Sequence, residues 1–286
     1  MNLYQETKKL MRQYEITAKK DLGQNFLIDE EVIHDIIHSA DIKKEDLVIE
    51  IGPGLGTLTE KLLENAGKVV CIELDKDMLT ILRQRFQAEK KIEMIHADIL
   101  KFNLKEKIKE EKENKEIKSI KIVANLPYYI TTPIIMKLLE EKLDIQSITV
   151  MIQKEVADRL SEIPGGKHTG AITYTMYYYA ITSKVRTVPH TSFIPEPDVE
   201  SEVIHIQLRN SPAVKVQDEK KFFEIVKYAF MQRRKTLLNA LGNTNRIDKE
   251  KLKNILKEMN LNEKVRGENL SIEQYAELVN KLETID

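Results

Sequence analysis

The chain has little cysteine, no long apolar run and no excess charge of either sign. Its one cysteine, Cys71, excludes a disulfide within the chain. It stands in the apolar run 69–72, where we expect a small buried side chain rather than a catalytic thiol. No stretch approaches the roughly 18 uncharged apolar residues that a membrane span needs, and the first residues carry no apolar signal core. We therefore expect a cytoplasmic protein without a membrane segment.

The charge balance is close to neutral, with 45 Lys+Arg against 46 Asp+Glu. Nucleic-acid-binding proteins tend to be basic, so this balance argues against RNA binding unless the charges are segregated on one face. The run Arg233-Arg234-Lys235 is the local candidate for such a face, and a solvated helix face is the alternative interpretation. No cluster of His, Cys, Asp or Glu has the spacing of metal ligands, so we predict no metal.

Short apolar runs alternate with amphipathic stretches between residues 46 and 152, followed by further helical patterns toward the carboxyl terminus. This alternation is typical of strand–helix units in a mostly parallel sheet. We predict a domain over residues 1–210 and a helical domain over 211–286. The expected strands are 47–51, 68–73, 92–96, 120–124, 147–152 and 201–208, and the expected helices are 55–65, 77–89, 133–142, 218–241, 248–259 and 271–282.

Two segments stand out by composition. Residues 105–118 are almost all Lys, Glu and Asn, so we expect a solvated excursion that buries no core face. The tyrosine-rich cluster at 174–179 invites interpretation as a platform for stacking bases, but its helical spacing favours core packing for most of the rings.

The strongest local signal is a strand that runs into the glycine-rich turn Gly52-Pro53-Gly54-Leu55-Gly56. Glycines there let a ligand approach the backbone, and the following helix offers free N–H groups. Glu73 ends the next strand, where nucleotide-binding folds place a carboxylate for ribose hydroxyls. Asp98 follows the third strand and could accept a hydrogen bond from the amino group of an adenine. His96 is expected to be a core or edge histidine rather than a catalyst.

The fourth strand leads into Asn125-Leu126-Pro127-Tyr128, which resembles the Asn-Pro-Pro-aromatic motifs of methyltransferases that act on planar amines. The lone pair of adenine N6 is delocalised into the ring and is a poor nucleophile. The Asn125 side-chain oxygen and a backbone carbonyl beside Pro127 can both accept hydrogen bonds from N6 and aim its lone pair at the methyl group. Tyr128 can stack on the base. A nicotinamide-dependent oxidoreductase would share the glycine turn but would leave this motif without a role.

Further segments extend the resemblance to nearly the whole chain, from about residue 18 to 280. The chain resembles the KsgA/RsmA ribosomal RNA adenine dimethyltransferases. The segments that carry this resemblance, in chain order, are 21–27, 52–56, 125–128, 153–160, 192–195 and 232–237.

This resemblance implies a Rossmann-like class I methyltransferase with a doubly wound, seven-stranded, mostly parallel sheet and a small helical C-terminal domain. It implies that S-adenosylmethionine supplies methyl groups to two adjacent adenosines near the 3' end of small-subunit ribosomal RNA, within the immature 30S subunit. The implied cofactor residues are Asn25, Leu27, Gly52, Gly54, Glu73, Asp98 and Asn125.

For the substrate, the resemblance implies that Phe193 stacks on the target base opposite Tyr128, although a core position is the alternative for this ring. Arg233, Arg234 and Lys235 would meet RNA phosphates. We expect direct methyl transfer by a monomer, with the N6 proton lost to solvent. Two alternatives remain open at this point: an Erm-like enzyme that methylates large-subunit RNA, and a non-enzymatic ribosome-assembly factor.

Overall fold

The structure is a computed structural model that describes residues 2–166, 168–242 and 247–283. It divides into two compact units. The sheet unit holds the chain up to Ala157 together with Thr182–Leu208, and the helical unit holds Asp158–Ile181 and the chain from Arg209 onward. The sequence placed a single boundary after residue 210. The structure differs because residues 158–181 leave the sheet unit and place Tyr174 and Tyr178 in the core of the helical unit.

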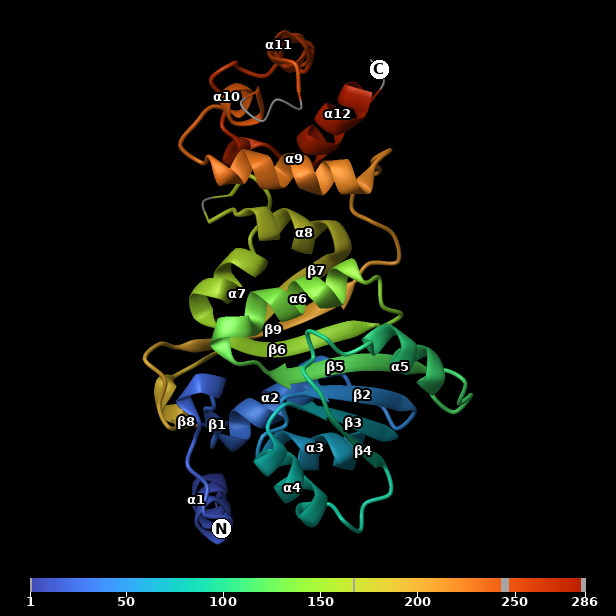
Figure 1. Cartoon of the computed structure of the whole chain (residues 1–286), viewed down its shortest axis with the longest axis vertical. Helices are drawn as coiled ribbons and strands as arrows, with labels where there is room; N and C mark the ends of the chain where they lie inside the picture. Colours follow the sequence, from blue (N-terminus) through green and yellow to red (C-terminus); the bar gives the residue numbers. More distant parts are fainter. Residues whose placement is uncertain (1, 167, 243–246, 284–286) are drawn as a thin grey trace. The chain divides into compact units, whose positions relative to one another are not determined.

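The sheet unit is built on seven strands in the order β4-β3-β2-β5-β6-β9-β7 (Figure 1). The first five in this order run parallel, and β9 is antiparallel to β6. This confirms the predicted doubly wound, mostly parallel sheet, in which β7 had no predicted counterpart. The strands are β2 Asp46–Ile51, β3 Lys68–Glu73, β4 Ile92–His96, β5 Ser119–Asn125, β6 Ser147–Gln153, β7 Ala180–Val188 and β9 Ser201–Leu208.

Helices α2 and α3 pack on one face of this sheet. Asp29 caps the start of α2, where its side chain accepts hydrogen bonds from the N–H groups of Glu31 and Val32. The helix face with Val32 and Ile36 packs in the core against the sheet. The helices that begin in this unit are α1 Leu3–Gln13, α2 Glu30–Ala40, α3 Thr57–Asn65, α4 Lys76–Arg85, α5 Leu104–Glu111, α6 Thr131–Glu140 and α7 Lys154–Leu160.

Helix α5 corrects the expectation of a solvated excursion at 105–118. Its Leu104 and Ile108 side chains are buried. Lys107 is also buried, with its ammonium 2.7 Å from Glu93 and 2.9 Å from Glu111. The expectation was wrong because the charges of this segment neutralise one another and pair with Glu93 of β4, so the helix can lie against the sheet.

The helical unit has a core of its own, formed by aromatic and aliphatic side chains such as Phe222 and Tyr275. Tyr174 belongs to this core and donates a hydrogen bond to the Leu270 carbonyl at 2.5 Å, which confirms core packing for this ring. The helix expected over 218–241 ends at Met231 and resumes at Leu237. The helices are α8 Ala171–Tyr179, α9 Glu219–Met231, α10 Leu237–Gly242, α11 Lys249–Glu258 and α12 Ile272–Glu283.

None of the helices in the described part of the chain is long and apolar enough to cross a membrane.

Candidate active site

The polar residues singled out in the sequence lie at the carboxyl ends of four neighbouring parallel strands. Gly52 follows β2, Glu73 ends β3, Asp98 follows β4 and Asn125 ends β5. The strand order reverses between β2 and β5, and open α/β sheets bind their ligands at this kind of switch point. A pocket opens there in the sheet unit.

All but one of the predicted cofactor and catalytic residues line this pocket, and Phe193 is the exception. Segment 22–27, which precedes helix α2, forms part of the wall. The predicted residues at the pocket are Asn25, Leu27, Gly52, Gly54, Glu73, Asp98, Asn125, Leu126, Pro127 and Tyr128.

The glycine turn after β2 exposes its backbone to the pocket. Gly52 has a φ of +67°, and nothing lies within 4 Å of the place where a Cβ would be. Gly56 has a φ of +82°, and a Cβ there would come within 2.7 Å of the Phe86 ring. The first glycine therefore leaves room for a ligand beside the backbone, and the last lets helix α3 start close to α4.

Glu73 is a buried carboxylate that holds this turn. The Gly54 N–H donates to Oε2 at 3.1 Å, and the Asp75 N–H donates to Oε1 at 2.8 Å. Burial raises the pKa of Glu73, and these backbone N–H groups act against the shift. Two ionised oxygens offer about four acceptor positions, so Glu73 keeps capacity for ribose hydroxyls.

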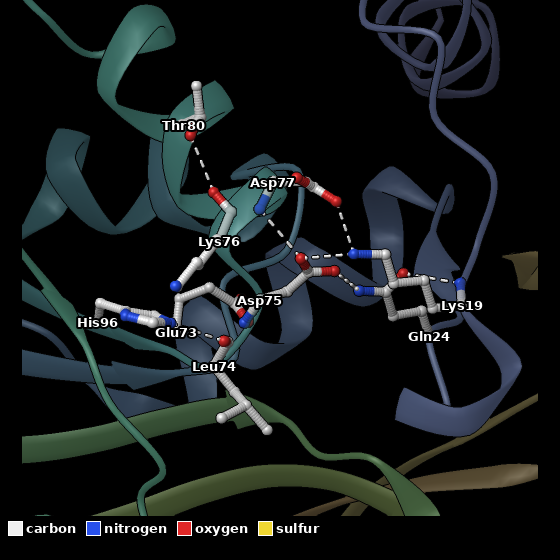
Figure 2. Close-up of polar contacts among 9 residues, drawn as sticks. All are labelled: Lys19, Gln24, Glu73, Leu74, Asp75, Lys76, Asp77, Thr80 and His96. Carbon is white, nitrogen blue, oxygen red and sulfur yellow. Dashed lines mark hydrogen bonds and ion pairs between the residues drawn. The ribbon is translucent and has the colours of Figure 1, made fainter.

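Asp98 and His96 flank the same edge. The Asp98 carboxylate lies at the pocket and accepts the Leu100 N–H at 2.9 Å. His96 is exposed, and its Nε2 lies 3.0 Å from the Leu74 carbonyl (Figure 2). His96 is thus an edge histidine, and it is not among the residues that line the pocket.

The segment Asn125-Leu126-Pro127-Tyr128 forms another part of the pocket wall. Asn125 Nδ2 donates to the Asn25 carbonyl at 3.1 Å, which orients the amide and leaves Oδ1 without a donor among the described residues. The Pro127 carbonyl accepts from the Thr131 hydroxyl at 3.0 Å. The Tyr128 hydroxyl shares a 2.5 Å hydrogen bond with Ser201 Oγ, which fixes the ring.

Phe193 does not line the pocket. Its side chain is 2% exposed and belongs to the core under the sheet. Strand β8 Phe193–Ile194 pairs antiparallel with β1 Phe26–Leu27, with Phe193 opposite Leu27. This pairing turns the ring into the core, so the structure supports the core interpretation and gives no support to stacking on a base.

Sequence reasoning missed Glu50, which lines the pocket from within β2. This carboxylate is fully buried and accepts the Thr59 hydroxyl at 2.6 Å, while Cys71 Sγ lies 3.6 Å away. Cys71 is buried as predicted. The signal for Glu50 was available, because a charged residue inside an apolar strand next to a glycine turn is rarely placed there for packing.

The burial of Glu50 predicts a pH-dependent stability. Burial raises its pKa from 4.5 to about 7, so the folded state holds a proton that the unfolded state has lost between these values. The associated stability is complete below the unfolded pKa and is lost as the pH rises through the folded pKa, a change of about 3 kcal/mol.

We expect Glu50→Gln to unfold with a flatter pH dependence than the wild type and to be the more stable protein above about pH 7. Urea unfolding at several pH values measures this, with exposed Glu113→Gln as the control. A wild-type slope in Glu50→Gln would show that Glu50 is not the titrating group.

Within the described residues, no group of three or more His, Cys, Asp or Glu could hold a metal ion. That the reaction needs no metal ion stays a prediction.

The parallel sheet, the glycine turn and the polar strand ends define a Rossmann-like methyltransferase. Solved structures share this fold. A dimethyladenosine transferase from Plasmodium falciparum has a TM-score of 0.76 at 25% identity, over 91% of this chain and 98% of that one. The 23S rRNA methyltransferase ErmE has a TM-score of 0.69 at 23% identity, over 91% and 100% of the two chains, which shows the fold alone.

The family model of ribosomal RNA adenine dimethylase matches residues 15–284, and the chain belongs to this family. It is similar to ribosomal RNA small subunit methyltransferase A from Clostridium botulinum, with 49% identity over 272 residues, 95% of this chain and 96% of that protein. The enzyme of the same name from Clostridioides difficile is 44% identical over 284 residues, 99% of this chain and 97% of that protein. These identities favour the small-subunit enzymes over the Erm-like alternative.

Proposed function

We propose that this chain uses S-adenosylmethionine to dimethylate N6 of two adjacent adenosines near the 3' end of small-subunit ribosomal RNA. Membership of the ribosomal RNA adenine dimethylase family supports the reaction. The observation that carries the proposal is the Asn125 amide at the pocket. Its Nδ2 donates to the Asn25 carbonyl, and no described residue donates to its Oδ1. We further propose a cytoplasmic monomer that acts on the immature 30S subunit.

The residues at the pocket fit the proposed cofactor. The open space over Gly52 accommodates a ligand against the backbone. Glu73 would accept hydrogen bonds from the ribose hydroxyls, and Asp98 would accept one from the adenine amino group. Asn25 and Leu27 of segment 22–27 would cover the cofactor. When bound, S-adenosylmethionine supplies an electrophilic methyl group on sulfur.

The residues of the Asn125 segment prepare the acceptor nitrogen. Asn125 Oδ1 and the Leu126 carbonyl would each accept one hydrogen bond from the N6 amino group, which draws its lone pair out of conjugation. Tyr128, held through Ser201, would stack on the extruded base and contribute about 1 to 3 kcal/mol to its binding. These contacts orient the nitrogen for direct attack.

No described residue that lines the pocket is a lysine, histidine or arginine. The carboxylates that line it are Glu50, Glu73 and Asp98; we assign Glu73 and Asp98 to the cofactor, and Glu50 accepts the Thr59 hydroxyl. We therefore propose a transfer without a dedicated general base, in which the chain orients the nitrogen and the N6 proton leaves to solvent after attack. The pocket thus works by positioning the reacting groups, which can lower the activation free energy by several kcal/mol.

The proposed function is tested by incubating the purified chain with methyl-labelled S-adenosylmethionine and small ribosomal subunits from cells that lack this modification. We expect label in the RNA, with four methyl groups per subunit at completion. Binding of the cofactor without any transfer to RNA would contradict the proposal and would favour the assembly-factor alternative.

For RNA contacts we propose the turn between α9 and α10. Arg234 and Lys235 are exposed there. Arg233 donates to Glu268 at 3.1 Å and to the Thr169 carbonyl at 3.2 Å, so part of its bonding capacity serves the helical unit itself.

We expect replacement of Arg234 and Lys235 by alanine to weaken binding to small subunits and to reduce the slope of log affinity against log salt by about 1.5, since each phosphate contact releases less than one counterion. Filter binding at several salt concentrations measures this slope. Exposed Lys257→Ala is the matched control. An unchanged slope in the double variant would place the RNA contacts elsewhere.

A further inference from the structure

The loop after β3 carries a buried carboxylate that the proposed mechanism leaves without a role (Figure 2). Asp75 is 2% exposed at its side chain. The Lys19 ammonium donates to Oδ1 at 2.8 Å, and Gln24 Nε2 donates to Oδ2 at 2.8 Å. Lys19 also reaches Asp77 Oδ2 at 2.6 Å. Each oxygen of the Asp75 carboxylate therefore accepts a hydrogen bond from a residue of the N-terminal segment.

The same two residues close a turn within their own segment. The Lys19 N–H donates to Gln24 Oε1 at 2.9 Å, and the Gln24 N–H donates to the Lys19 carbonyl at 3.3 Å. The chain between them includes the short 3-10 helix Lys20–Leu22 and Gly23, which has a φ of +61°. Segment 22–27, which overlaps the end of this turn, lines the pocket. The position of this turn consequently sets the position of the pocket wall.

The Asp75 carboxylate is also connected to the reacting parts of the site. The backbone N–H of Asp75 donates to Glu73 Oε1 at 2.8 Å. Across the pocket, Asn125 Nδ2 donates to the carbonyl of Asn25, the residue after Gln24. A continuous path of hydrogen bonds and chain therefore joins the ribose-holding carboxylate to the catalytic amide through Asp75 and Gln24.

We propose that Asp75 is a positioning residue for the cofactor site, which through Lys19 and Gln24 holds segment 22–27 over the pocket. We name these three residues the latch. Because segment 22–27 forms part of the pocket wall and would cover the bound cofactor, the latch sets how long the cofactor stays bound. The inference rests on the proposed use of S-adenosylmethionine.

Capping of α4 does not account for the latch. Asp75 Oδ1 accepts the Asp77 N–H at 3.0 Å, which is the bond that an N-cap requires. The bonds to Lys19 and Gln24 are additional. Burial alone raises the pKa of Asp75, but the bonds from Lys19, Gln24 and Asp77 outweigh burial and lower it. The closed latch thus holds an ionised carboxylate, whereas Lys19, 42% exposed at its side chain, can return to water on opening.

The test measures the binding of S-adenosylhomocysteine by calorimetry and its release by stopped flow. We expect Lys19→Ala to raise the dissociation constant about tenfold, mainly through faster release, because a charged hydrogen bond to a buried carboxylate is lost. Amide exchange should accelerate in segment 22–27 and stay unchanged in α4. Lys19→Arg should restore most of the affinity.

The matched control is Lys76→Ala, which removes an equal charge from the same region. Lys76 is exposed, and its side chain forms no ion pair among the described residues. We expect this variant to bind like the wild type. Asp75→Asn keeps the N-cap, because asparagine caps as well as aspartate, and it should weaken binding as Lys19→Ala does. The double variant should be little worse than either single one.

The two proposals fail in different ways. If the wild type binds S-adenosylhomocysteine but Lys19→Ala and Asp75→Asn bind it equally well, the latch is purely structural and the inference is overturned. If the wild type itself does not bind S-adenosylhomocysteine, the proposed cofactor is wrong, and the role proposed for the latch is contradicted as well.

Discussion

Asn125→Ala is expected to lower the turnover of methyl transfer by about a hundredfold to a thousandfold, the scale seen when a catalytic hydrogen-bonding group is removed. In the proposed mechanism the side-chain oxygen accepts a hydrogen bond from N6 and orients it, and alanine offers no acceptor in its place. Turnover with small subunits, alongside cofactor affinity and urea unfolding, separates lost chemistry from lost folding. We expect the unfolding transition to stay close to that of the wild type, because among the described residues the amide makes one hydrogen bond, to the Asn25 carbonyl.

Asn125→Asp sharpens this prediction. The carboxylate keeps oxygen acceptors, but it cannot donate to the Asn25 carbonyl, so it loses the contact that orients the native amide. We expect turnover between those of the wild type and the alanine variant. Exposed Asn114→Ala serves as the control and should be fully active. Near-normal turnover in Asn125→Ala would remove the assigned role.

Glu73→Ala is expected to raise the dissociation constant for S-adenosylmethionine about a hundredfold, because hydrogen bonds to a charged group contribute about 1.5 to 3 kcal/mol each. The loss has two parts. The ribose hydroxyls would lose the acceptor that we propose for them, and Gly54 loses its hydrogen bond to Glu73 within the glycine turn. Isothermal calorimetry measures the change.

Glu73→Gln is a milder change that removes the charge and one of the two oxygens. Its amide oxygen can still accept one N–H, whereas the other position becomes a donor that faces either Gly54 or Asp75. We expect weaker binding than in the wild type and tighter binding than in the alanine variant. The exposed Glu116→Ala is the control. An unchanged dissociation constant in Glu73→Ala would contradict the ribose assignment.

The sheet could be predicted closely because its parallel strands are apolar runs with abrupt ends. Strands β3 and β4 begin and end where the sequence indicated. Strand β7 escaped because its burial is mixed and its residues include Ser183, Lys184 and Arg186. Helix α5 escaped because its buried lysine is neutralised by Glu93, a partner on a different element. Local pattern cannot reveal a neutralising partner that only folding brings close.

The positions of Glu73, Asp98 and Asn125 at the pocket were predictable, because each stands at or just after the end of a parallel strand. The latch was not predictable, because Lys19 and Asp75 lie 56 residues apart and each has an ordinary sequence context. Phe193 shows the opposite limit. Its expected place at the base came from resemblance, whereas the pairing of β1 with β8 turns its side chain into the core.

The central claim is the chemical identity and location of the product. The most direct measurement supplies methyl-labelled S-adenosylmethionine to separated, unmodified small and large ribosomal subunits and maps the products by nuclease digestion and mass spectrometry. The account predicts N6,N6-dimethyladenosine at two adjacent positions near the 3' end of the small-subunit RNA and no label in the large subunit. Label confined to large-subunit RNA, or methyl groups on an atom other than adenine N6, would contradict it.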